Sequence, residues 1–158
     1  MVKKRKFNYL LLAVCLAVSY SVAFVGSLVT YSQVNSIWYK SIRPEITPPN
    51  FVFPIIWNLL FFMIGLSLFY ALSSRKGNNK NKIVTLFSSN FALNVSWSYF
   101  YFGLKDIRLA MIDIVFLWFS ILAMIVYLWN KERRSSLLLV PYLIWVAFAA
   151  VLNLLSIR

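Results

Sequence analysis

The chain has 158 residues, of which 61% are hydrophobic and 18% aromatic, and it carries a formal net charge of +12. Its apolar residues form long blocks instead of alternating with charged ones, which excludes an ordinary soluble domain and indicates an integral membrane protein. With no histidine and a single cysteine, it predicts no metal site, no serine–histidine–aspartate triad and no internal disulfide. The basic residues sit in short clusters between the apolar blocks, an arrangement that favours membrane orientation over nucleic-acid binding.

Five apolar blocks predict an all-α fold: a polytopic membrane bundle of five transmembrane helices that forms a single domain over residues 1–158. Each block approaches the ~20 residues that a helix needs to cross a bilayer. We expect the spans at about 7–30, 51–72, 83–102, 109–129 and 137–157, with a proline-rich loop at 31–50.

The basic residues predict an orientation. Of 16 lysines and arginines, eleven lie before the first span, after the second or after the fourth, and five lie after the first, third or fifth span. By the positive-inside rule the N-terminus is cytoplasmic, and a bacterial plasma membrane is the expected location. The first span could instead be a signal peptide cleaved near Ala23, but its removal would break the agreement between span number and loop charge.

Prolines organise two segments of the chain. Pro44, Pro48 and Pro49 predict a loop, because proline in a helix interior removes a backbone hydrogen bond. Pro54 suits the start of the second span, and Pro141 should kink the fifth span or end a preceding turn. A stiff aromatic loop that leads into a tryptophan-bearing helix is where we expect a ligand.

The third span has two distinct faces at helical spacing. One carries two amides and two aromatic rings, and the opposite one carries small residues. The amides should face the bundle interior, either as the wall of a pocket or as links between helices. The small face suits either a homodimer contact or packing within one chain. The first face holds Asn90, Asn94, Trp97 and Tyr101, and the second includes Ser88, Ala92 and Ser96.

Two further spans carry aromatic stripes, and a fourth carries an isolated acid. Three stripes that each contain a tryptophan suit a flat, largely apolar ligand. Asp113 in the fourth span is either a proton or substrate site or a hydrogen-bonding residue between helices. The stripes are Phe53, Trp57 and Phe61 in the second span and Trp145, Ala149 and Leu152 in the fifth.

Ordered motifs from residue 24 to residue 153 resemble the translocator protein family, also known as TspO, tryptophan-rich sensory protein or peripheral benzodiazepine receptor. They are FVGS at 24–27, WY at 38–39, PP at 48–49, LNVSW at 93–97 and PYLIWVAFAAVLN at 141–153. The resemblance implies a five-helix membrane protein, commonly a homodimer, that binds porphyrins, other tetrapyrroles, sterols and benzodiazepine-type ligands.

The resemblance also implies site residues. A pocket between the helices would be lined by Trp57, Phe61, Asn94, Trp97, Trp145, Ala149 and Leu152, and covered by Trp38, Tyr39 and Pro48. Phe61 stands where the family usually has tyrosine, which removes a hydroxyl from that pocket. The C-terminal sterol pattern of animal members needs a tyrosine that residues 152–158 lack, so the chain departs from the family there.

Two functions follow from this interpretation. The first is a tetrapyrrole-binding protein for porphyrin or haem that acts in sensing or transport, needs no cofactor and also accepts benzodiazepine-type ligands. Lys40 or Arg43 would meet the propionates. The alternative is a light- and oxygen-dependent porphyrin-degrading enzyme in which Trp57 and Trp145 are catalytic, as reported for some bacterial relatives. A small multidrug exporter fits poorly, because the first span lacks an acid.

Overall fold

The computed structural model describes residues 8–74 and 79–157. This part of the chain is all-helical, with seven α-helices and one π-helical turn. The elements are α1 (Tyr9–Gln33), α2 (Ile37–Ile42), α3 (Val52–Ser73), α4 (Lys80–Ser98), η1 (Tyr99–Gly103), α5 (Ile107–Trp129), α6 (Arg133–Leu138) and α7 (Val140–Ser156).

Four stretches of the described chain are long and apolar enough to cross a membrane: α1, α3, α5, and Arg133–Ser156, which joins α6 to α7. The prediction of five transmembrane helices is therefore wrong. The predicted third span ran from 83 to 102 and included the aromatic residues of η1. The helix that forms begins at Lys80 and ends at Ser98, so it gains two lysines, loses four aromatic residues and keeps its serines and asparagines.

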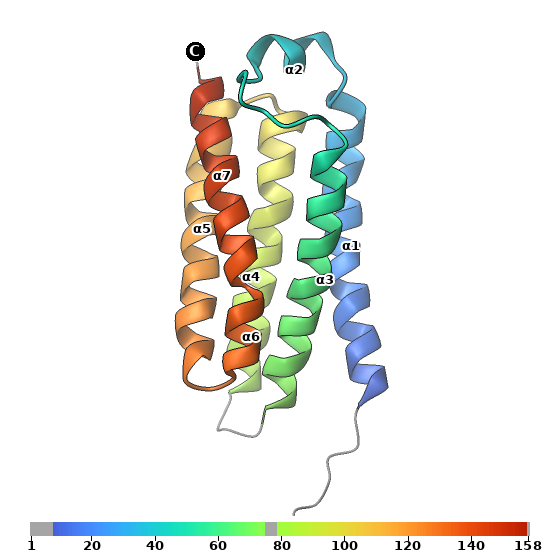
Figure 1. Cartoon of the computed structure of the whole chain (residues 1–158), viewed down its shortest axis with the longest axis vertical. Coiled ribbons are helices and arrows are strands. Elements are labelled where there is room, and N and C mark those ends of the chain that lie inside the picture. The colour runs from blue at the N-terminus through green and yellow to red at the C-terminus, as the bar shows by residue number, and fades with distance from the viewer. Residues whose placement is uncertain (1–7, 75–78, 158) are drawn as a thin grey trace, which may run out of the picture.

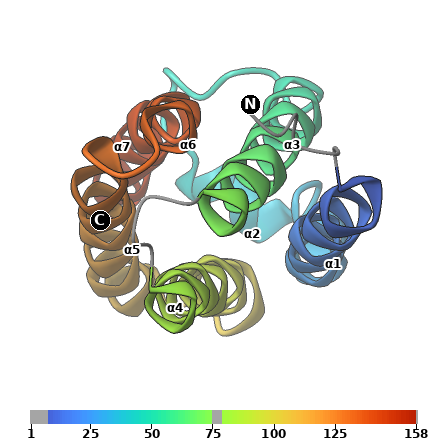
Figure 2. The same ribbon diagram turned by 90° about the horizontal axis from the view of Figure 1, so that it is seen from below.

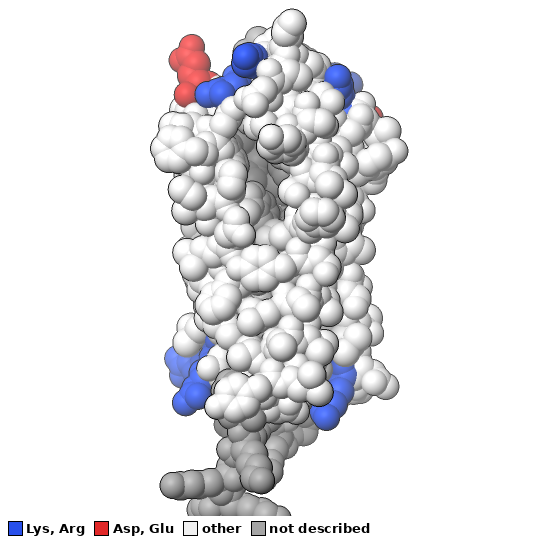
Figure 3. All heavy atoms as spheres, turned by 90° about the vertical axis from the view of Figure 1, so that its right-hand side faces the viewer, with Lys and Arg blue, Asp and Glu red and all other residues white. Residues whose placement is uncertain are grey.

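The long helices lie side by side, and α2 with the proline-rich loop crosses one end of the bundle (Figure 1). Viewed along the bundle, α1 lies at the periphery beside α3 (Figure 2). Accordingly, its buried residues are few: Cys15, Ser19 and Gly26. On the face in view in Figure 3, a broad band without charged side chains separates the two charged ends. That band is what a bilayer-embedded surface requires.

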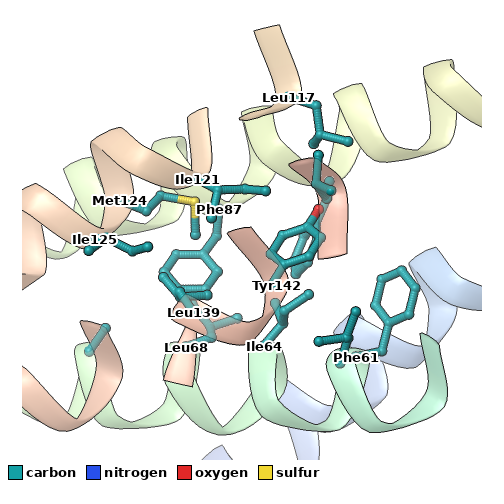
Figure 4. Close-up of a cluster of buried hydrophobic side chains, with 14 of the residues drawn as sticks. Phe61, Ile64, Leu68, Phe87, Leu117, Ile121, Met124, Ile125, Leu139 and Tyr142 are labelled. Atoms are coloured by element: carbon teal, nitrogen blue, oxygen red, sulfur yellow. The ribbon is translucent and has the colours of Figure 1, made fainter. Parts of the chain in front are cut away.

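The core lies between α3, α4, α5 and α7. In Figure 4, Leu68 of α3, Phe87 of α4 and Ile121 of α5 point toward one another. All three are at most 7% exposed, and Tyr142 of α7 is completely buried in the same cluster. This close packing leaves the outer faces of the helices for lipid.

Local sequence signals determine where the helices begin. The side chains of Ser36, Asn79 and Asp106 each accept a hydrogen bond from a backbone N–H in the first turn of α2, α4 and α5. Pro54 lies in the first turn of α3, as predicted. Pro141 lies at the start of α7, directly after the break that ends α6, which confirms the expected disruption of the fifth apolar block.

Small residues let the helices approach closely. A Cβ atom added to Gly65 of α3 would lie 2.8 Å from Leu16 Cδ2 and 3.2 Å from Leu16 Cα, so α1 packs directly on this glycine. The Ser67 and Ser135 hydroxyls lie 2.8 Å apart, and each also donates to the other residue's carbonyl oxygen, at 2.9 and 2.7 Å. These bonds hold α6 against α3, where lipid could not satisfy a buried hydroxyl.

Candidate ligand site between α3, α4 and α7

Two aromatic pairs join α3 to α7. The ring centroids of Phe53 and Trp145 lie 5.9 Å apart, and those of Trp57 and Tyr142 lie 6.2 Å apart, both edge to face. Trp57 also packs on Phe61 one turn further along α3, with a centroid distance of 5.7 Å. The predicted stripe of α3 therefore faces α7, and aromatic surfaces dominate the space between these helices.

Tyr142 also organises the polar side of the site. Its hydroxyl accepts a hydrogen bond from Asn94 Nδ2 at 3.0 Å and donates one to Asn90 Oδ1 at 3.3 Å. Asn90 Nδ2 in turn donates to Ser120 Oγ of α5 at 2.8 Å. Both asparagines are buried and point into the bundle. The amides thus link α4 to α5 and α7, which satisfies groups that would be costly to bury alone.

The third predicted tryptophan lies nearer the end of the bundle that α2 crosses. Trp97 Nε1 donates to Asn153 Oδ1 of α7 at 3.1 Å, and Asn153 Nδ2 donates to the Ile107 carbonyl oxygen at 2.9 Å. The Trp97 ring packs on Tyr101 and Phe102 of η1, at 5.3 and 6.2 Å. Trp97 therefore contacts α7 through Asn153, whereas Trp57 contacts α7 through Tyr142.

The predicted cover of the site packs on this aromatic group. Trp38 of α2 meets Tyr101 edge to face at 6.0 Å, and Tyr39 meets Phe102 at 5.5 Å. Tyr39 is buried, while Trp38 and Pro48 are half-buried. Outside the membrane-spanning helices, burial raises the pKa of the Tyr39 hydroxyl, and the neighbouring Arg43 charge partly opposes that shift. The described contacts thus fix α2 to η1.

Two buried polar atoms near the site have no hydrogen-bond partner among the described residues. One is Trp145 Nε1 and the other is Asp113 Oδ2, on a side chain that is 7% exposed. A buried donor or acceptor without a partner is unfavourable, and such groups are unusual in folded proteins. The indole N–H of Trp145 is therefore available to an acceptor on a bound molecule.

The structure brings the predicted ligand residues together in two groups. One surrounds Tyr142 and the other surrounds η1, while Ala149 and Leu152 lie buried on α7. Within the first group, the rings of Phe53 and Trp145 and those of Trp57 and Tyr142 are in contact. Two hollows elsewhere have other linings: one of about 430 Å³ at residues 104–108 and Ile157, and an open groove of about 270 Å³ between α5 and α7. A ligand that lies between the paired rings would therefore separate them.

Tyr142 is the site residue that sequence reasoning missed. It lies three residues before Trp145, so helical spacing already places it near the same face of α7. The predicted dimer residues lie on the other side of α4 from the asparagines: Ser88 and Ala92 are exposed and Ser96 is half-buried.

Long apolar helices, buried amides and an uncharged outer band together define a multi-pass integral membrane protein. The sequence profile of the TspO/MBR family matches residues 12–157. The chain is 37% identical over 147 residues to the tryptophan-rich protein TspO of Chlorobaculum tepidum, covering 91% of this chain and 92% of that one. It is 35% identical to the Archaeoglobus fulgidus protein of the same name, over 92% of this chain and 94% of the other. It is 30% identical to the translocator protein of Bos taurus, over 82% of this chain and 78% of that one.

The chain therefore belongs to the TspO/MBR family.

Proposed function

We propose that this protein binds a tetrapyrrole, porphyrin or haem, between α3, α4 and α7, and that binding serves sensing or transport. The observation that carries the proposal is the pair of aromatic contacts, Phe53 with Trp145 and Trp57 with Tyr142, which bring large flat rings from two helices to one place. Flat aromatic surfaces with few polar groups suit a flat macrocycle, and they suit benzodiazepine-type ligands for the same reason.

A ligand that lies between the paired rings separates them. An aromatic pair contributes about 0.5–1.5 kcal/mol beyond its buried area, so opening both loses about 1–3 kcal/mol of ring–ring interaction, and the ligand covers the area that the rings expose. A macrocycle between the rings restores two stacking surfaces, and an acceptor on it satisfies the unpartnered N–H of Trp145. The opening cost is small beside the gain from burying a large apolar ligand.

The cover supplies positive charge for the ligand's carboxylates. Arg43 Nη1 donates to Asn50 Oδ1 at 3.3 Å, which holds the guanidinium beside the loop that precedes α3. Lys40 is exposed on α2. Porphyrin propionates would meet these cations while the macrocycle lies in the apolar interior.

The test compares two tryptophans. Protoporphyrin IX is titrated into the detergent-solubilised full chain, and its dissociation constant is measured by absorbance for the wild type, Trp145→Phe and Trp118→Phe. Trp118 is the matched control, because it lines the outward groove between α5 and α7. We expect Trp145→Phe to weaken binding about 5- to 30-fold, since one hydrogen bond and part of a stacking surface are lost. Equal affinities for all three proteins would refute the site.

A second candidate function is light- and oxygen-dependent porphyrin degradation, in which dioxygen oxidises the bound macrocycle. It is favoured by the position of two oxidisable indoles, Trp57 and Trp145, on both sides of the site. Protoporphyrin is bound to the wild type, to Trp57→Phe and to Trp145→Phe, each sample is illuminated in oxygen, and the loss of porphyrin absorbance is followed over time. Slower bleaching per bound porphyrin in the variants would support catalysis by these residues, and equal bleaching would exclude it.

We also infer the orientation and assembly. The end where α4 begins carries five described cations and one acid, whereas the opposite end carries four cations and two acids. The N-terminus of α1 lies at the same end as the start of α4 (Figure 1). The positive-inside rule then places this end on the cytoplasmic side of the plasma membrane. The small residues Ser88, Ala92 and Ser96 on α4 suit a homodimer contact, which cross-linking at position 92 would test.

A further inference from the structure

The end of the bundle where α4 begins and α5 turns into α6 concentrates positive charge. We call the five residues concerned the basic end: Lys80, Lys82, Lys131, Arg133 and Arg134. Glu132 is the described acid within this group. Among the residues that the structure describes, none of the five cations forms an ion pair with a carboxylate. The charge of the basic end therefore remains available to an external anion.

Aromatic side chains hold three of these cations in place. Lys131 Nζ lies 4.3 Å from the centroid of the Tyr127 ring and donates a hydrogen bond to its hydroxyl at 3.1 Å. Lys82 Nζ, from α4, lies 4.7 Å from the centroid of the same ring. Arg133 lies with its guanidinium carbon 4.7 Å above Trp129. Cation–π contacts orient a cation without neutralising it, because the ring carries no net charge.

Two ammonium groups that gather at one ring repel each other. Lys82 and Lys131 come from different helices, so the arrangement is not imposed by their spacing on one helix. An anion that contacts both groups would relieve the repulsion and complete the hydrogen bonding of each ammonium. The geometry is thus suited to a group with several negative oxygens, such as a phosphate.

From these contacts we propose that the basic end is a binding site for the phosphate headgroup of an anionic membrane phospholipid, with Lys82 and Lys131 as its principal contacts. Charge complementarity selects an anionic over a zwitterionic lipid. The site lies at the edge of the apolar band, where exposed apolar side chains adjoin it: Val84, Val126 and Trp129. Acyl chains of a bound lipid would lie along these side chains, and the ring of Trp129 suits the interface.

The experiment measures lipid binding to the full chain by native mass spectrometry in detergent. Phosphatidylglycerol and phosphatidylcholine with identical acyl chains are titrated against the wild type, Lys82→Gln/Lys131→Gln and Lys105→Gln/Arg108→Gln. The last variant is the matched control, because it removes two charges from the opposite end and leaves the cations proposed to meet the propionates in place. A further variant, Lys82→Arg/Lys131→Arg, keeps the charge of the site.

We expect the wild type to prefer phosphatidylglycerol. Each cation near the headgroup accounts for about a fivefold change in affinity, so Lys82→Gln/Lys131→Gln should lose about 25-fold. The control and the arginine variant should stay within about twofold of the wild type, and binding should weaken with rising salt. Equal affinity for the two lipids, or an equal loss in the control, would overturn the proposal. It would also fail if soluble glycerol phosphate displaced the lipid, since the site would then serve free phosphates.

Discussion

Replacing Tyr142 with phenylalanine isolates the role of one hydroxyl in the bundle. The ring stays, so its contact with Trp57 and its packing in the core are kept. The change removes the acceptor of Asn94 Nδ2 and the donor to Asn90 Oδ1. Asn90 keeps its bond to Ser120 through Nδ2. The variant therefore leaves the buried Nδ2 of Asn94 and the buried Oδ1 of Asn90 without the Tyr142 hydroxyl as a partner.

The magnitude depends on the surroundings. In a soluble core, an orphaned buried group costs about 1–3 kcal/mol. Hydrogen bonds between helices within a membrane contribute less, about 0.6–1.7 kcal/mol each, because the unfolded helices also find partners in the bilayer. The lower range, for bonds within a membrane, applies to a bundle of apolar helices. The loss of two bonds should therefore lower the free energy of unfolding by about 1–3 kcal/mol.

The assay is reversible unfolding in mixed micelles, followed by near-ultraviolet circular dichroism. Tyr31→Phe is the control, because Tyr31 is 85% exposed and its change should stay within about 0.5 kcal/mol. Removing the orphaned partner as well, in Tyr142→Phe/Asn94→Leu, should cost less than the two single changes added together. An unchanged free energy for Tyr142→Phe, or strictly additive effects, would refute this account of the network.

Two further changes probe the packing of α1 and α2. Gly65→Val should destabilise the protein by about 1–3 kcal/mol, because its Cβ would lie 2.8 Å from Leu16 Cδ2 and 3.2 Å from Leu16 Cα. A melting temperature equal to that of the wild type would contradict the close approach of α1. Burial raises the pKa of Tyr39 above its ordinary value of 10.0, so the stability that neutral Tyr39 contributes is present below pH 10.0 and lost as the pH rises above it. Trp38 fluorescence should report release of α2 in that range, and Tyr39→Phe should abolish the transition.

Helical periodicity predicted which faces turn inward. The spacing of Asn90 and Asn94 placed both amides in the interior, and the structure shows why: each meets a polar group on another helix. Prolines were equally informative, since a missing N–H restricts Pro54 and Pro141 to the beginnings of helices. These features depend on neighbours within one helix, which a sequence displays directly.

Two local features, and one that depends on distant parts of the chain, escaped prediction. The extent of α4 was misjudged because an Asn79 cap starts the helix at Lys80, while a π-helical turn takes over its last aromatic residues. The short helix α2 lies inside a segment predicted as loop, although Ser36 caps its first turn. The joining of α3 to α7 by aromatic pairs depends on how far apart these helices pack, and no local pattern records that distance.

Both proposed functions require a tetrapyrrole between the aromatic stripes of α3 and α7. The most direct measurement is a crystal structure of the full chain with protoporphyrin IX bound. We predict the macrocycle between Trp57 and Trp145, with the contacts of Phe53 to Trp145 and Trp57 to Tyr142 opened and an acceptor at the Trp145 indole N–H. A macrocycle in the outward groove beside Trp118, with both aromatic pairs still closed, would contradict the account.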